Sequence, residues 1–100
     1  MKEITLTCEI VFLEIAEKYF NFPITNSIRS SFWIADDKVS TFSQIKIPDN
    51  NIVLGRTEVV EMTLIERDFL MNRIKSGTEF RMGVFPREIA LGRVIKVQSR

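Results

Sequence analysis

The strongest constraint on the fold of this chain is an alternation of apolar residues near its start. Ile4, Leu6, Cys8, Ile10 and Phe12 occupy every second position, and threonine or glutamate fills the first positions between them. Successive side chains of a β-strand point to opposite faces, so a period of two predicts a half-buried strand. The sequence therefore predicts that the fold begins with β-structure.

Further segments with strand character follow, and residues that favour turns separate them. The segments cover residues 29–35, 39–47, 52–54, 58–65, 79–84 and 88–97. Asp, Asn, Gly and Pro lie between them, and these residue types favour turns. Six or seven short strands joined in this way predict an all-β barrel or sandwich. A length of 100 residues is enough for a single domain over residues 1–100 and too short for two.

One segment favours a helix instead. Within residues 67–75, Phe69, Leu70 and Ile74 share one face of a helix. Gly77 follows at the position that glycine often occupies just past a helix end. We therefore expect one short helical segment there, and residues 14–19, where the alternation stops, are compatible with a helical turn.

The phases of the predicted strands identify the residues that face the core. The predicted inward set is Leu6, Cys8, Ile10, Phe32, Ile34, Val60, Met62, Leu64, Phe80, Met82 and Val94. Trp33 lies on the phase opposite to its neighbours Phe32 and Ile34. Two interpretations of Trp33 stay open: an exposed anchor for a partner, because Trp is enriched at interface hot spots, or packing beneath a neighbouring loop.

The composition excludes several kinds of catalytic site. The chain has no histidine, so nucleophilic sites that pair Ser or Cys with His are excluded, as are the usual zinc ligand sets. Cys8 is the only cysteine, and its inward phase favours a core residue over a reactive thiol. The glycines are scattered and form no phosphate-binding loop, and Asp36-Asp37 is typical of a solvated turn. We expect no enzyme activity, no cofactor and no metal.

The charge and the start of the chain bear on partners and location. The formal net charge of +1 gives no general attraction to nucleic acid. The alternating pattern begins directly after Met1-Lys2-Glu3, without a long apolar run, so we expect neither a signal peptide nor a membrane span. The sequence thus predicts a cytoplasmic protein that does not bind membranes.

The second half of the chain resembles the closing strands of the C-terminal β-barrel of elongation factor Tu and its eukaryotic counterpart. Residues 59–65, 77–84 and 87–97 match the family patterns V-T-L-I, G-x-R-F-A-I/V-R and R-T-V-x-x-G-V-V-x-K-V, and Gly92 keeps the family's glycine. Earlier, residues 29–34 resemble R-P-Q-F-Y-F and residues 38–41 resemble D-V-T-G. The resemblance covers about Ile4 to Val97 and lacks the GTPase domain. It implies a closed, six-stranded antiparallel barrel with Greek-key connections.

In that family the barrel docks against the GTPase domain and contacts the backbone of the tRNA T-stem, and both faces differ here. Phe85 and Pro86 replace two glycines of the turn that approaches phosphate, which removes accessible backbone donors. Phe20-Asn21 replaces an Arg-His pair, and Arg81 replaces a small alanine of the docking face. The resemblance therefore implies a free-standing barrel with an altered route to tRNA and no binding or hydrolysis of GTP.

Two functional hypotheses follow. The first is a non-catalytic module that binds a protein of the translation machinery, or one that recognises elongation factor Tu, as a decoy, adaptor or immunity-type inhibitor. Its predicted binding surface consists of Ser31, Trp33, Phe85, Pro86 and Arg87. The alternative is binding to the backbone of tRNA or another RNA, with an affinity that falls steeply with salt. The candidate residues for RNA are Arg29, Ser40, Arg81, Arg87 and Arg93.

Overall fold

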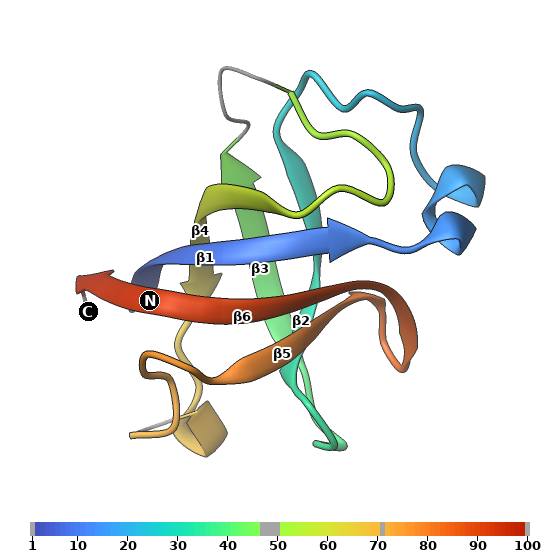
Figure 1. Cartoon of the computed structure of the whole chain (residues 1–100). Helices are drawn as coiled ribbons and strands as arrows, with labels where there is room; N and C mark the ends of the chain where they lie inside the picture. The colour runs from blue at the N-terminus through green and yellow to red at the C-terminus, as the bar shows by residue number, and fades with distance from the viewer. Residues whose placement is uncertain (1, 47–50, 71, 100) are drawn as a thin grey trace.

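Six antiparallel strands close into a barrel (Figure 1). The computed structural model describes residues 2–46, 51–70 and 72–99. The strands are β1 (Glu3–Phe12), β2 (Ile28–Ile34), β3 (Thr41–Lys46), β4 (Glu58–Ile65), β5 (Glu79–Val84) and β6 (Arg87–Ser99). Their order around the barrel is β1-β4-β3-β2-β5-β6, and β6 pairs with β1 to complete the closure. The predicted all-β, six-stranded antiparallel barrel is confirmed.

The connections follow a Greek-key pattern. Strands β2, β3 and β4 are consecutive neighbours, and β1 lies on the free side of β4. Closure gives each strand a neighbouring strand on both sides over part of its length, which removes most of the open edge that a lone sheet of this size would expose. Thr5 of β1 pairs with Ser99 of β6, so the two ends of the chain lie side by side (Figure 1).

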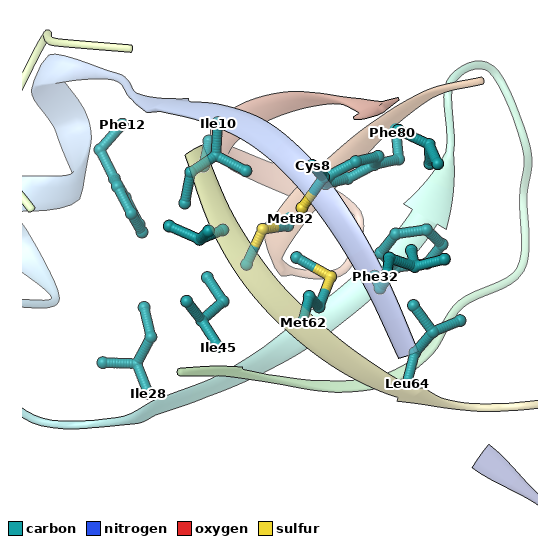
Figure 2. Packing of buried hydrophobic residues seen from close by; sticks show 14 of the residues in the cluster. Cys8, Ile10, Phe12, Ile28, Phe32, Ile45, Met62, Leu64, Phe80 and Met82 are labelled. Atoms are coloured by element: carbon teal, nitrogen blue, oxygen red, sulfur yellow. The ribbon is translucent and has the colours of Figure 1, made fainter. Parts of the chain in front are cut away.

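The inside of the barrel is filled by the side chains that the strand phases predict. Every member of the predicted inward set is buried except Ile34, which is partly buried against the core. In Figure 2, Met62 and Met82 lie in the middle of the labelled side chains. Phe32 and Phe80 stack at one end of this group, with ring centroids 4.7 Å apart. The alternation in the sequence therefore specifies the register as well as the fold class.

Gly92 is required by the position of Phe80. The two residues pair directly across β5 and β6. A Cβ atom on Gly92 would lie 2.3 Å from Cζ of the Phe80 ring, well inside van der Waals contact. The Phe80 ring can occupy this position in the core only because Gly92 has no side chain. This is a physical reason for glycine at the position where the elongation factor pattern also has glycine.

Two segments differ from the predicted elements. The helix expected over residues 67–75 is only a 3-10 turn, η2 (Asp68–Leu70), because Asn72 adopts a left-handed backbone with φ of 63° that ends helical structure. Leu70 and Ile74 are buried even so. The segment is held by the Arg73 guanidinium, which donates two hydrogen bonds of 2.8 Å to the Asp37 carboxylate. The strand expected over residues 52–54 is reduced to one bridge between Ile52 and Ile24.

Other boundaries shift slightly. The helical turn compatible with residues 14–19 is present as the 3-10 helix η1 (Glu14–Lys18). Strand β3 begins at Thr41, two residues later than predicted, and the predicted last residue of that strand, Ile47, lies outside the described residues. Within the described ranges, no helix is long and apolar enough to cross a membrane.

Cys8 is a core residue, as its inward phase predicts. It is fully buried on β1, and burial raises the pKa of its thiol to about 12, with a smaller contribution from the nearby charge of Glu9. Because the thiolate is the reactive form of cysteine, the native protein should resist alkylation by iodoacetamide at pH 8. Denaturant should make the labelling fast, and mass spectrometry measures both rates.

The raised pKa of Cys8 also gives a pH dependence of known sign. Between the ordinary thiol pKa of 9.0 and about 12, the unfolded chain loses the thiol proton and the folded chain keeps it. The free energy of unfolding should therefore fall as pH rises through this range. A Cys8→Ala variant should show a smaller fall in urea melts. Equal falls in the two proteins would assign the effect to other groups.

Candidate functional site

The most exposed large apolar side chain among the described residues belongs to Phe42, in the middle of the outer surface of the barrel. Along β3, Thr41, Ser43 and Ile45 are buried, and the alternate residues face solvent. Phe42 is 65% exposed there, on the same phase as Gln44. An aromatic ring in this position contributes nothing to the barrel core, and burying it against a partner is worth roughly 1.5–3 kcal/mol.

Phe42 lies in a groove on the outer face of the barrel. The groove has a volume of about 670 Å³, within the range of roughly 300–1,000 Å³ that is typical of ligand pockets. Its lining comes from all six strands and from the segment after η1. The lining includes Glu3, Tyr19, Phe20, Arg29, Ser30, Ser31, Phe42, Gln44, Thr63, Ile65, Gly83, Val84 and Ile89.

The strand register explains why these residues meet. Phe42 pairs with Ser31 of β2, which in turn pairs with Gly83 of β5. On the other side of β3, Gln44 pairs with Thr63 of β4. Ile65 and Glu3, which pair across β4 and β1, form the far end. The groove therefore runs across the strands, and its composition depends on the register of five of them.

The 3-10 helix η1 sets the other end of the groove. The Leu13 backbone N–H donates to the Ile89 carbonyl at 2.9 Å, and the chain after η1 is held by a bond of 3.0 Å from the Phe20 N–H to the Ala16 carbonyl. Tyr19 therefore lies at this end, and its hydroxyl accepts a hydrogen bond of 2.8 Å from Arg87 Nη1. The same bond raises the pKa of Arg87 above its ordinary value.

The arginines of the barrel fall into two groups by partner. Four of them contact a carboxylate: Arg56 with Glu58, Arg73 with Asp37, Arg81 with Glu88 at 3.6 Å, and Arg93 with Glu9 at 2.6 Å. Within the described ranges, Arg29, Arg67 and Arg87 have no carboxylate partner. Arg29 lines the groove and Arg87 contacts its wall at Tyr19, so two positive charges without a carboxylate partner belong to the groove.

Trp33 is not exposed, and the structure decides between the two interpretations of this residue. Its side chain points to the outside of the barrel wall, as its phase predicts, but it is only 3% exposed. Phe85 covers it, with the two rings edge to face and their centroids 5.0 Å apart. Packing beneath a neighbouring loop is therefore confirmed, and the expectation of an exposed Trp anchor is wrong.

The other residues of the predicted protein-binding surface are distributed around the groove. Ser31 lines it, and Arg87 reaches it through Tyr19. Phe85 is partly buried against Trp33, and Pro86 is exposed at the tip of the turn between β5 and β6. The predicted surface thus adjoins the groove, but the accessible aromatic ring is that of Phe42.

The predicted RNA-binding residues do not form one surface of free cations. Arg81 and Arg93 are paired with Glu88 and Glu9, which lowers the net charge that they offer to phosphate. Ser40 is partly buried just before β3 and does not line the groove. Only Arg29 and Arg87 lie near the same groove without a carboxylate.

Sequence reasoning did not identify Phe42 or Tyr19. A signal for Phe42 was present, because it shares its phase with Gln44 and Lys46 and is thus an aromatic residue on a polar face. No such signal exists for Tyr19, since η1 brings it to the groove through tertiary contacts. In the described part of the chain, no group of three His, Cys, Asp or Glu side chains is placed to hold a metal ion.

The similarity to the elongation factor barrel rests on the motifs quoted above and stays a prediction. No model of a protein family matches this chain, and no curated protein matches it either.

Proposed function

We propose that this barrel is a non-catalytic interaction module that binds a protein through the groove around Phe42. The observation that carries the proposal is the 65% exposure of this ring in the middle of a groove of about 670 Å³. Exposed aromatic rings that a partner can desolvate are typical energetic centres of protein interfaces. Val84, which is 59% exposed, and the partly exposed Tyr19 extend the apolar surface on one side of Phe42.

The proposed partner belongs to translation or recognises a translation factor. This part of the proposal rests on the motifs that resemble the elongation factor barrel. A barrel with that outline would compete for proteins that bind the elongation factor. It would then act as a decoy, an adaptor or an immunity-type inhibitor.

Binding to RNA is the second candidate function, and one observation favours it. Arg29 lines the groove and Arg87 contacts the hydroxyl of Tyr19, and neither arginine has a carboxylate partner among the described residues. Cations beside aromatic rings suit single-stranded nucleic acid. A wide phosphate-binding surface is disfavoured, because Arg81 and Arg93 each contact a carboxylate.

Protein capture with matched variants tests the proposal. Tagged protein, incubated with an extract of its native cells at low and moderate salt, should retain a specific protein that mass spectrometry identifies. Phe42→Ser should lower the retained amount at least about tenfold, as expected for a hot-spot ring. Val59→Ser is the matched control, because Val59 is 56% exposed on β4 and does not line the groove.

Two results would contradict the proposal. One is equal retention of the partner by Phe42→Ser and Val59→Ser. The other is recovery of tRNA instead of protein, with a loss of that tRNA in an Arg87→Ala variant. The second result would establish the RNA-binding alternative.

A further inference from the structure

We propose that the groove binds an extended peptide segment of the partner, in which acidic side chains lie at one end and apolar side chains follow. This inference deepens the proposed function and rests on it, because it names the chemistry of the partner at the same groove. Three features of the groove carry it: the charges at its ends, the apolar surface between them, and an unpaired stretch of β2.

The charges at the two ends are different. Arg87 contacts Tyr19 at one end and Arg29 lines the groove, and neither contacts a carboxylate of the described residues, whereas most arginines elsewhere on the barrel do. A guanidinium group binds a carboxylate through two parallel hydrogen bonds, which gives both strength and orientation. Glu3 lies at the opposite end. The Tyr19 end therefore suits an acidic side chain of a partner.

The surface between the ends is apolar. The exposed ring of Phe42 lies between Ile65 on the β4 side and Val84 on the β5 side. Aliphatic side chains of a peptide would bury against these residues. The groove is less suitable for a nucleic acid for two reasons. Phosphates would meet the like charge of Glu3 at its end of the groove, and bases stack best on flat aromatic rings, not on aliphatic side chains.

The third feature is the pairing of β2. Its pairing with β3 covers Ile28 to Phe32, but its pairing with β5 begins only at Ser31. Residues 28–30 therefore have a strand neighbour on one side only. Of these three, only Arg29 directs its backbone N–H and C=O to the open side, because successive residues of an antiparallel strand bond to opposite sides and Ala35 bonds to Glu79 on the β5 side. Arg29, Ser30 and Ser31 all line the groove. A peptide that crosses the strands in the groove can therefore form backbone hydrogen bonds with Arg29 at this one position.

Titration of the ¹⁵N-labelled full chain with designed probes tests the inference. The first probe is a seven-residue peptide with two acidic residues at one end, three aliphatic residues in the middle and two serines at the other end. The second replaces its acidic residues with lysine, the third replaces its aliphatic residues with serine, and the fourth is a uridine decanucleotide. The acidic-aliphatic peptide should bind at least about tenfold more tightly than the other probes. Amide shifts should concentrate at Arg29, Ser31 and Gly83.

Two pairs of variants separate the contributions. Arg29→Gln should weaken binding of the acidic-aliphatic peptide about three- to tenfold, and Arg67→Gln, which changes an arginine outside the groove lining, should leave binding unchanged. Phe42→Ser should weaken the same peptide about tenfold or more, and Val59→Ser should not. All four residues are exposed, so the variants should fold.

The possible outcomes are distinct. Absence of binding at millimolar peptide, equal binding of the lysine peptide, or shifts that lie elsewhere on the barrel would each overturn the inference. Tighter binding of the uridine probe at the same residues would do so in favour of RNA. If Phe42→Ser abolishes capture of a partner but no peptide binds, the proposed function stands and this inference fails. If the peptide binds as expected but no partner is captured, the peptide specificity of the groove stands and the proposed function fails.

Discussion

Substitution of Gly92 by alanine should lower the free energy of unfolding by about 3 kcal/mol, near the upper end for overpacked cores. The added Cβ would lie 2.3 Å from Cζ and 2.4 Å from Cε1 of Phe80. The Phe80 ring has little room to move away, because it is fully buried and stacks on Phe32 with a centroid distance of 4.7 Å. A domain of this size is typically stable by about 5–15 kcal/mol, so the loss is a large fraction. Urea unfolding followed by circular dichroism measures it.

A double-mutant cycle identifies the Phe80 ring as the cause. Phe80→Leu removes the ring atoms that the new Cβ would overlap, at the cost of a smaller core side chain. The double variant Gly92→Ala/Phe80→Leu should therefore be more stable than the sum of the two single effects predicts. Additive effects would show that the strain of Gly92→Ala lies in the backbone and not in contact with the ring.

The fold could be predicted from the sequence because its signals are local. The alternation of Ile4 to Phe12 needs only the period of a strand. The series of short strands leaves a barrel and a sandwich open, and closure into a barrel is expected only from the resemblance to the elongation factor barrel. No local signal in the sequence shows that the helix predicted over residues 67–75 is absent. Its apolar face is real, since Leu70 and Ile74 are buried, but the left-handed backbone of Asn72 interrupts it. Apolar spacing alone does not separate a helix from a buried loop.

The candidate site was harder to predict because it depends on contacts between distant segments. The sequence predicts correctly that Trp33 faces outward. Whether its ring is exposed depends on Phe85, which belongs to a turn between two other strands. The groove likewise needs the register of β1 to β5 and the placement of Tyr19 by η1. Phase assigns each residue to a face of the sheet, and only tertiary packing decides whether that face is covered.

Trp33 and Phe42 both lie on the outer face of the barrel, but their replacement by alanine should change the free energy of unfolding by very different amounts. Trp33→Ala should lower the free energy of unfolding by about 3–5 kcal/mol, the usual range for removing a buried aromatic side chain. The reasons are its 3% exposure and its edge-to-face contact with Phe85. Phe42→Ala should change stability by less than about 0.5 kcal/mol, as for most surface positions.

Measurement of both variants by urea unfolding, together with partner capture, separates stability from recognition. Phe42→Ala should keep the stability of the barrel and lose the partner, because its ring is 65% exposed in the groove. Trp33→Ala should lose stability first, and any loss of binding should follow the fraction of unfolded protein. A Trp33→Ala variant with unchanged stability and lost binding would restore Trp33 as the anchor. It would also show that Phe85 leaves the Trp33 ring in solution and uncovers it for the partner.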